Sequence, residues 1–204
     1  MKRLALLLLA AAAYGQTTTI TVTGPASIPA GGIATLTVSM AGSSGQSVTA
    51  LQWTLALPSG ATMGTPVAAT AWATAGDAVT CNPANGTCLI AGSQTVMSDG
   101  AVATIPITLG PTAGTDPVAL SGLFAAAVIG GQGVMVNGMT VGVAYSIKVL
   151  SRCDLNSDGI VNAADVQLMI GDALGLSTCP TGYTCNLVAV VNEIIAATGG
   201  ACKN

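Results

Sequence analysis

The sequence has 204 residues, no histidine, little charge and few aromatic side chains. Without histidine, a Ser-His-Asp or Cys-His catalytic set and an imidazole zinc site are excluded. Only five residues are Lys or Arg, too few for a surface that follows phosphates, so we expect no nucleic-acid partner. Aromatic residues make up 3% of the chain although 51% of it is hydrophobic, which predicts a core built from aliphatic side chains.

The N-terminus has the pattern of a secretory signal peptide. Residues 1–3 are positively charged, residues 4–13 are apolar, and the small residues Ala13 and Gly15 fit a cleavage site. The apolar run is too short to span a bilayer as a helix, and no longer one follows it. We therefore predict a signal peptide over residues 1–15, secretion of the rest of the chain, and no membrane span. An uncleaved N-terminal anchor is the alternative interpretation.

Secretion determines how the six cysteines are interpreted. An even number of cysteines in an oxidising compartment predicts three disulfides, for which the sequence alone allows 15 pairings. A thiolate metal site is the alternative, but the chain has no close CxxC pair. Two cysteine pairs bracket short loops rich in turn residues, and the remaining two enclose the C-terminal region. We expect the pairs Cys81–Cys88, Cys179–Cys185 and Cys153–Cys202.

Residues 16–150 have the pattern of an all-β domain. Leu51, Trp53 and Leu55 alternate with smaller or polar residues, as in a half-buried strand, and residues 36–40 and 105–109 repeat the alternation. Pro106 within the last run favours a strand at a sheet edge. Turn sequences such as Ser98-Asp99-Gly100 separate the runs, which predicts a sandwich or barrel. The apolar stretch 118–143 contains glycines and polar residues, so we interpret it as buried strands with bends.

The order of these strands resembles a cohesin domain. The resemblance is carried by an opening strand over 33–40 after Pro29-Ala30-Gly31-Gly32, then by residues 48–55 and 98–105. It implies a jelly-roll β-sandwich of the kind also found in carbohydrate-binding modules. An unrelated immunoglobulin-like sandwich is the alternative, since sandwiches share this patterning without common ancestry.

A calcium-binding pattern follows at residues 154–165. Oxygen-bearing side chains occupy the first, third, fifth, ninth and twelfth places of a loop of 12 residues, and Gly159 occupies the sixth. The seventh place offers a backbone carbonyl. Calcium prefers six to eight such oxygens. We predict a Ca²⁺ site with the ligands Asp154, Asn156, Asp158, Ile160, Asn162 and Asp165. The alternative is a turn rich in Asn and Asp, in which Asp165 caps the next helix.

The residue pattern of this loop resembles that of a dockerin repeat. The twelfth place carries Asp165 instead of glutamate, and no amphipathic helix precedes Asp154. Dockerins contain two such EF-hand-like repeats, each with a helix. Here the first helix would bury Val166, Met169, Ile170 and Ala173, and the second would bury Leu187, Val190, Val191 and Ile194. The second loop retains only Asn186 as a ligand, so we predict one calcium ion. The resemblance implies a dockerin-like module over residues 151–204.

The two resemblances together imply a secreted, non-catalytic assembly protein. Cohesins and dockerins bind one another with calcium in extracellular polysaccharide-degrading or cell-surface complexes. A chain with both permits head-to-tail association of its own copies, and contacts that do not close give filaments. In dockerins the tenth and eleventh places contact the partner, but here they are Ala163 and Ala164. A further alternative is that the small module docks on its own sandwich, because the join 150–152 is very short.

The acidic and aromatic residues bear on two other function classes. Glycoside hydrolysis needs a pair of carboxylates, and outside the calcium loop and helices only Asp77, Asp99 and Asp116 are available, each in a turn where we expect it to be solvated. We therefore predict no catalytic residue. A carbohydrate-binding function needs exposed aromatic side chains. Trp53 alternates into the core, which leaves Trp72 as the candidate platform for a polysaccharide.

Overall fold

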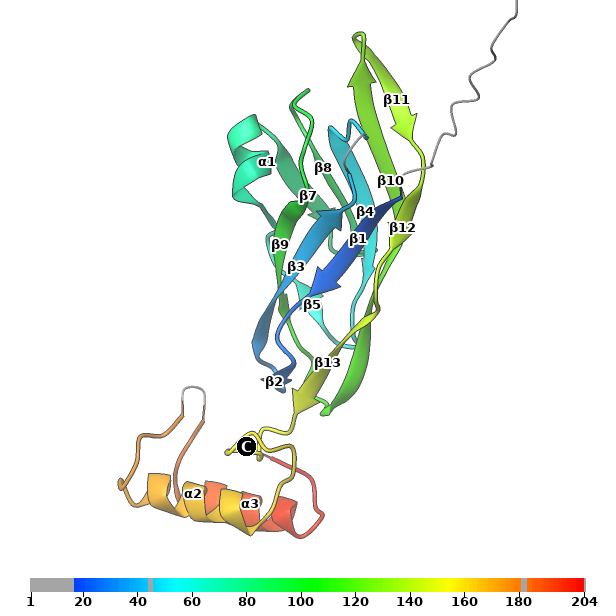
Figure 1. Cartoon of the computed structure of the whole chain (residues 1–204). Coiled ribbons are helices and arrows are strands. Elements are labelled where there is room, and N and C mark those ends of the chain that lie inside the picture. The colour runs from blue at the N-terminus through cyan, green and yellow to red at the C-terminus, as the bar shows by residue number, and fades with distance from the viewer. Residues whose placement is uncertain (1–16, 44–45, 181–182, 204) are drawn as a thin grey trace, which may run out of the picture.

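The computed structural model describes residues 17–43, 46–180 and 183–203. Most of the described chain forms two curled β-sheets that face one another, and two helices follow at the C-terminal end (Figure 1). The predicted signal peptide over residues 1–15 lies outside the described residues. In the part that is described, no helix is long and apolar enough to cross a membrane.

The first sheet has the strand order β12–β1–β3–β9–β5, and β6 also pairs with β9. Neighbours are antiparallel except for β1 and β12, which run parallel. The strands are β1 (Thr18–Thr23), β3 (Ile33–Ala41), β5 (Thr62–Met63), β6 (Val67–Ala68), β9 (Gly100–Thr108) and β12 (Met139–Val141).

The second sheet has the order β2–β13–β10–β4–β8–β7, with β11 paired to β10. The long strand β10 lies in the middle of this sheet. The register of its pairing with β4 shifts between Ser121 and Phe124. Gly122 lies inside this irregularity with φ +58°, a conformation that favours glycine. The strands are β2 (Ser27–Pro29), β4 (Ala50–Ala56), β7 (Ala78–Asn82), β8 (Thr87–Ala91), β10 (Gly114–Ile129), β11 (Gln132–Val136) and β13 (Tyr145–Leu150).

The core lies between the two sheets and consists mainly of aliphatic side chains, as the composition predicts. Alternate residues of β3, β4 and most of β9 point inward, which confirms the predicted alternation over 36–40, 51–55 and 105–109. Trp53 is fully buried among them, also as predicted. The largest fully buried side chains of the sandwich are Ile20, Leu36, Met40, Leu51, Trp53, Leu55, Trp72, Ile90, Ile105, Ile107 and Ile147.

Two expectations about strands were wrong. The strand containing Pro106 is not an edge strand, because β9 pairs with β3 on one side and with β5 and β6 on the other. Pro106 is tolerated because it faces the gap between the two short strands β5 and β6, which pair with β9 on either side of it. The stretch 118–143 is not uniformly buried either, since β11 is almost entirely exposed at the end of a projecting hairpin (Figure 1).

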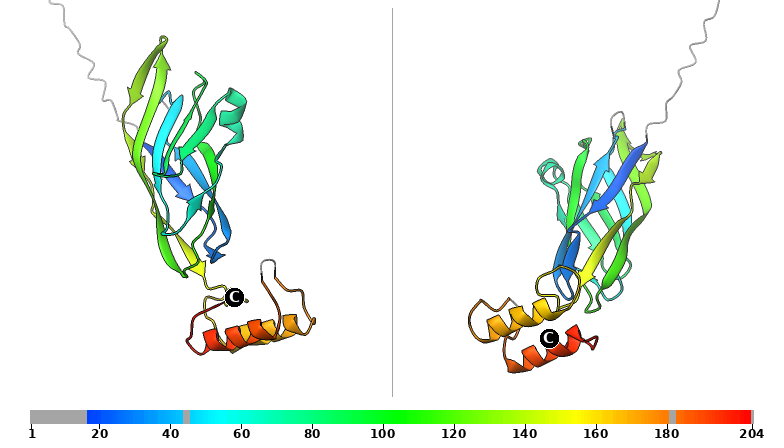
Figure 2. Two further views of the ribbon diagram at one scale, coloured as in Figure 1. Left: turned by 180° about the vertical axis from the view of Figure 1, so that it is seen from behind. Right: turned by 60° about the horizontal axis from the view of Figure 1, so that its bottom comes forward.

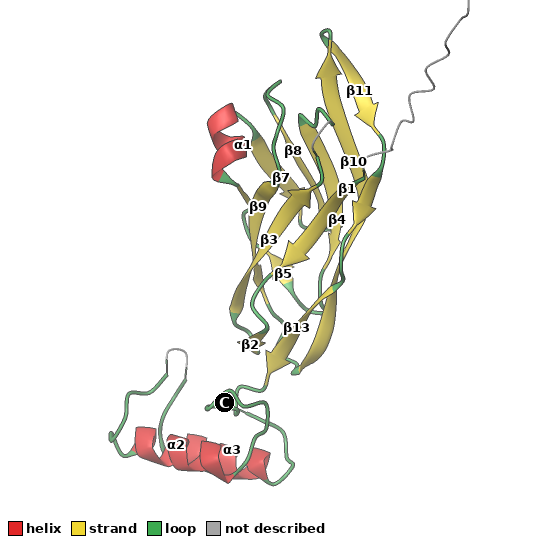
Figure 3. Ribbon diagram, viewed as in Figure 1, coloured by secondary structure: helices red, strands yellow, loops and turns green. Residues whose placement is uncertain are grey.

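Three helices complete the described chain (Figure 3). The short α1 (Thr70–Ala75) lies beside β7 and β9, whereas α2 (Ala163–Ala173) and α3 (Leu187–Ala197) follow the last strand. Both views in Figure 2 place α2 and α3 side by side at the end of the sandwich where β13 finishes. The three disulfides are Cys81–Cys88, Cys153–Cys202 and Cys179–Cys185, which confirms the expected pairing.

Candidate functional site

The loop 154–165 folds around the carboxylate of its last residue. Asp165 Oδ1 accepts hydrogen bonds from the backbone N–H groups of Leu155 (2.8 Å) and Asn156 (3.2 Å), and Oδ2 accepts one from Asn162 N–H (2.9 Å). Asp165 is fully buried in the first turn of α2. One side chain therefore holds both ends of the loop at the start of the helix.

The tip of the loop is a succession of tight turns made by side-chain oxygens. Asn156 Oδ1 accepts from Asp158 N–H at 2.9 Å, and Asp158 Oδ1 accepts from Ile160 N–H at 2.8 Å. Gly159 N–H donates to Asp154 Oδ2 at 2.8 Å, with Gly159 at φ +92°. Side chains of this kind replace backbone partners in turns. The tip residues Asn156, Asp158 and Ile160 are exposed.

The alternative interpretation of the motif as a helix cap is partly correct. Asn162, not Asp165, is the N-cap of α2, and its Oδ1 accepts from Ala164 N–H at 2.7 Å. Asp165 stands three residues later and completes a capping box by accepting from the N-cap backbone. The neighbouring Ala163 and Ala164 are exposed.

The loop offers the hard oxygen donors that calcium prefers, namely carboxylates, amide oxygens and a backbone carbonyl. Asp154 is 4% exposed, and its Oδ1 is buried without a hydrogen-bond partner. An unpartnered buried carboxylate oxygen is costly, and a bound cation would satisfy it. Across residues 17–43, 46–180 and 183–203, however, no three acidic or cysteine side chains converge closely enough to form a metal cluster by themselves. A cation here would therefore need amide and backbone carbonyl oxygens of the loop in addition to its carboxylates.

A buried carboxylate that the sequence analysis did not select lies next to this loop. Glu193, the chain's one glutamate, is fully buried on the inner side of α3. Burial, together with the negative charges of Asp165 and Asp154, raises the pKa of Glu193 to about 7. Burial also raises the pKa of Tyr183, which lies within reach of the charges of Arg152, Glu193 and Asp154. The spacing of Ala189, Glu193 and Ala196 on one side of a helix is the sequence signal for this position.

The predicted inner face of α3 was wrong in most of its members. Val190 is buried, but Leu187, Val191 and Ile194 are 77%, 48% and 46% exposed. The inner face carries small residues, Ala189 and Ala196, because α3 lies close against α2 and Met169. The larger apolar side chains therefore point away from α2. We call the exposed set Leu187, Val188, Val191, Ile194 and Ile195 the α3 outer face.

The degenerate second loop is closed by the Cys179–Cys185 disulfide. Asn186, the one ligand type retained there, is the N-cap of α3, and its Oδ1 accepts from Ala189 N–H at 3.0 Å. Residues 181–182 lie outside the described residues. The first predicted helix face agrees better, because Met169 is fully buried and Val166 and Ala173 are half-buried, although Ile170 is exposed.

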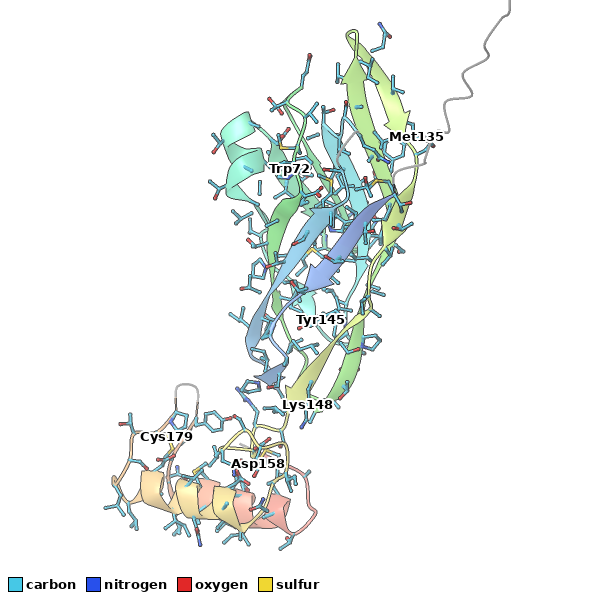
Figure 4. The ribbon with its side chains drawn as sticks, in the orientation of Figure 1. Trp72, Met135, Tyr145, Lys148, Asp158 and Cys179 are labelled. Atoms are coloured by element: carbon cyan, nitrogen blue, oxygen red, sulfur yellow. A yellow bond between two sulfur atoms is a disulfide. The ribbon has the colours of Figure 1, made fainter. Side chains whose placement is uncertain are left out.

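A second surface lies on the outward side of the second sheet. Leu89 in β8 is paired with Gln52 in β4, and Gln52 with Phe124 in β10, so the three side chains form one row. Met135 in β11 is paired with Ala126, two residues beyond Phe124 on the same side. Leu89, Phe124 and Met135 are 45%, 43% and 60% exposed. We call Leu89, Gln52, Phe124 and Met135 the outer sheet face, which contains no charged residue. Figure 4 labels Met135 near the far end from the helices.

The expected carbohydrate platform was wrong. Trp72 is 1% exposed, because α1 turns its indole into the core of the sandwich. The expectation that Asp77 is solvated was also wrong. Asp77 is 5% exposed and accepts hydrogen bonds from Ser93 N–H and Oγ–H, so it fixes the loop after β8. Asp99 ties two turns together by accepting from Gly42 N–H and Ser43, and these bonds lower the pKa of its carboxyl.

Comparison with known proteins identifies the fold of the sandwich. No protein-family model matches the sequence, and no curated protein is detectably similar to it. Among solved structures, a non-cellulosomal cohesin from the hyperthermophilic archaeon Archaeoglobus fulgidus matches with a TM-score of 0.52 and 15% identity, covering 67% of this chain and 93% of its own. A cohesin module from a Clostridium perfringens family 33 glycoside hydrolase matches with a TM-score of 0.53 and 11% identity, covering 66% and 97%. The described sandwich therefore has a cohesin-like fold.

Proposed function

We propose that the chain is a secreted, non-catalytic assembly protein that binds a protein partner in a calcium-dependent manner. The observation that carries the proposal is the presence of two uncharged, exposed apolar surfaces on a cohesin-like sandwich and its helical extension. Exposed apolar patches on a small protein mark sites of association, because water contact with them is unfavourable. The cohesin-like fold favours a protein partner over a small ligand.

Calcium enters the proposal through the loop 154–165, with the six predicted ligands Asp154, Asn156, Asp158, Ile160, Asn162 and Asp165. A bound divalent cation would add positive charge to a loop that carries three carboxylates. Binding to the folded form alone would stabilise the loop and α2 by mass action. Because α3 packs on α2, the α3 outer face would be ordered together with the loop. We interpret residues 151–204 as a dockerin-like module and residues 16–150 as the cohesin-like domain on this basis.

The proposed partner is a second copy of the same chain, joined head to tail. The outer sheet face and the α3 outer face lie at opposite ends of the molecule, so they do not meet within one copy (Figures 1 and 4). Both surfaces are apolar and uncharged, which suits them to each other. A contact between two different surfaces leaves one of each unused at the ends, and repetition gives a chain of molecules or a ring. Such an assembly would suit a cell-surface or polysaccharide-degrading complex.

The proposal is tested by light scattering coupled to size-exclusion chromatography, with calcium or with EDTA. We expect a mass above that of the monomer in calcium only. Phe124→Asp and Val191→Asp each place a charge in one of the two surfaces, and each variant alone should stay monomeric because every copy lacks one side of the contact. Val143→Asp is the matched control, because Val143 is 87% exposed outside both surfaces.

A mixing experiment distinguishes head-to-tail contact from other modes. The Phe124→Asp copy keeps its α3 outer face and the Val191→Asp copy keeps its outer sheet face. Mixed in calcium, the two variants should form a one-to-one dimer that neither forms alone. A wild-type protein that is monomeric in both calcium and EDTA at high micromolar concentration would contradict the second copy as partner.

A further inference from the structure

The strand β11 has one unpaired edge. On one side it pairs with β10, and on its other side no strand of the described residues pairs with it. The hairpin that contains it projects beyond the rest of the sandwich (Figure 1), and its residues are almost all exposed. An unpaired edge presents a row of backbone N–H and C=O groups that can pair with another strand.

The other strands at the sheet edges are protected in ways that β11 is not. Strands β2, β5, β6 and β12 have only two or three residues, and β7 contacts β6 of the first sheet. By contrast, β11 has five residues, no proline and an unbroken register with β10. No charged residue lies between Asp116 and Lys148. Charges, proline, bulges and short strands are the usual means of preventing edge-to-edge pairing, so the edge of β11 is suited to accept a strand.

The pairing of β10 with β11 determines which backbone groups point to the open edge. Ile129 and Gln132 pair across a two-residue turn, so they exchange both backbone hydrogen bonds. Hydrogen-bonded and non-hydrogen-bonded pairs alternate along an antiparallel ladder, so Val134 also bonds to β10. The N–H and C=O groups of Gly133 and Met135 therefore point outward.

This open edge is complementary to itself. When a second copy lies antiparallel with Val134 opposite its own counterpart, Gly133 of each copy faces Met135 of the other, and their outward groups pair. The Met135 side chain then lies over a glycine, whose Cβ position has open space around it. The two Val134 side chains meet on the opposite face of the sheet, where pairs of β-branched residues are favourable. Neither copy brings a charge to the contact.

We propose that β11 pairs antiparallel with β11 of a second copy, which joins the second sheets of the two copies into one. The contact uses the same segment on both sides, whereas the proposed head-to-tail contact joins two different surfaces, and it needs no calcium. A stable interface buries roughly 1,200–2,000 Å², and a contact of so few residues is weak alone. In a head-to-tail assembly the contact is repeated, so its effect adds and joins neighbouring assemblies sideways.

Disulfide trapping in EDTA tests the contact on the full secreted chain. All six cysteines are already paired, so a new cysteine is the one free thiol. Val134→Cys places this thiol opposite itself in a non-hydrogen-bonded pair, where Cα atoms about 4.5 Å apart allow a disulfide. With diamide as oxidant, we expect a covalent dimer at least about 10-fold faster than for Ile129→Cys, the matched control. Ile129 is 58% exposed on the same hairpin but belongs to β10.

A proline variant distinguishes strand pairing from contact between apolar side chains. In the Val134→Cys chain, Met135→Pro removes an outward N–H that β10 does not use, so the hairpin should persist and trapping should fall to the rate of the Ile129→Cys control. Met135→Gln removes the apolar side chain but keeps the N–H, and it should still be trapped. Thermal unfolding checks that both variants are folded. Equal loss of trapping in the two would show that side chains hold the copies together, which would overturn strand pairing.

The result is separable from that of the calcium-dependent assembly. Val134→Cys combined with Val191→Asp lacks the α3 side of the head-to-tail contact and should be trapped as fast as Val134→Cys alone. If Val134→Cys is trapped no faster than Ile129→Cys, β11 does not pair with a second copy, whatever calcium does. If Val134→Cys is trapped rapidly but the wild type stays monomeric in calcium, strand pairing stands and the head-to-tail proposal fails.

Discussion

The ammonium group of Lys148 lies against Gly159, in the space that a Cβ atom at position 159 would fill. Lys148 belongs to β13, the last strand of the sandwich, where it pairs with Thr115 and Ser27. Gly159 is the sixth residue of the loop that we propose binds calcium, at the place where glycine permits the sharp turn. The absence of a Cβ atom at Gly159 thus has a second consequence, because it lets Lys148 of the sandwich approach the loop. Figure 4 labels Lys148 and Asp158 on the two sides of this junction.

Gly159→Ala should weaken calcium binding and destabilise the helical segment by about 1–3 kcal/mol, since alanine is strained at φ +92° and its Cβ would displace Lys148. Gly175→Ala is the control, because Gly175 also has a positive φ of +72° but has open space around its Cβ position. Thermal unfolding and calcium titration of both variants measure the difference. Equal effects at the two positions would mean that the Lys148 contact has no energetic role.

Lys148→Met should strengthen calcium binding about two- to ten-fold. The ammonium group beside the loop repels a divalent cation, and methionine keeps the length of the side chain without its charge. Lys203→Met is the control, because Lys203 is exposed near the C-terminus. The gain should shrink as salt is added, since the charge is screened. Weaker binding by Lys148→Met would mean that the lysine holds the loop in its binding conformation.

The calcium-free protein should lose stability as the pH rises from about 5 to 8. The pKa of Glu193 is raised from 4.5 to about 7 in the folded protein, so the folded state holds a proton that the unfolded state releases. The stabilisation is therefore fully present below pH 4.5 and disappears as the pH passes 7. The groups that face Glu193 are Asp165, Asp154 and Tyr183, with Arg152 near Tyr183. Urea unfolding in EDTA at several pH values measures the effect.

Two measurements check the assignment to Glu193. The chain has a single glutamate, so its side-chain carboxyl carbon gives one identifiable NMR signal, which should titrate near pH 7. Glu193→Gln should flatten the dependence of stability on pH. A glutamate signal that titrates near its ordinary pKa would show that the site is more hydrated than its burial indicates.

The sandwich was predictable because its strands carry a strict alternation of buried and exposed residues. Leu51, Trp53 and Leu55 reveal their strand without any knowledge of its neighbours. The disulfides were predictable for a similar local reason, since two of them close loops of six or seven residues. The third pair then followed by elimination. The loop 154–165 stands out in the sequence because calcium requires particular atoms at fixed spacing, and calcium binding there stays a prediction.

The helical faces and the outer surfaces were not predictable from local pattern. The helix α3 is apolar on both sides, so its periodicity does not say which side meets α2. The small side chains of Ala189 and Ala196 determine which side of α3 packs on α2, because they allow the two helices to approach closely. Glu193 is buried on the same side. The burial of Trp72 was also not predictable from local pattern. A short helix between two strands has no alternation, and only the fold of α1 over the core shows that the indole is covered.

The disulfides should differ in their contribution to stability. Cys153–Cys202 spans 49 residues and Cys81–Cys88 spans 7, so the chain-entropy model gives the longer loop about 1.7 kcal/mol more stabilisation. Replacing Cys153 and Cys202 by serine should expose the helical segment to limited proteolysis and reduce calcium affinity. The Cys81→Ser, Cys88→Ser variant is the control, since this pair joins two neighbouring strands of the sandwich. Equal protease sensitivity in the two variants would contradict a local role for Cys153–Cys202.

Substitutions of two aromatic residues should distinguish a core position from a position in the interaction surface. Trp72→Ala leaves a cavity in the sandwich and should cost about 3–5 kcal/mol, because its side chain is 1% exposed. Phe124→Ala removes a side chain that is 43% exposed and should cost about 1 kcal/mol or less, yet it should weaken calcium-dependent self-association. Urea unfolding and light scattering measure the two effects on the same samples. If Phe124→Ala associates as the wild type does while Trp72→Ala, still folded, does not, the contact surface lies near α1 instead of on the outer sheet face.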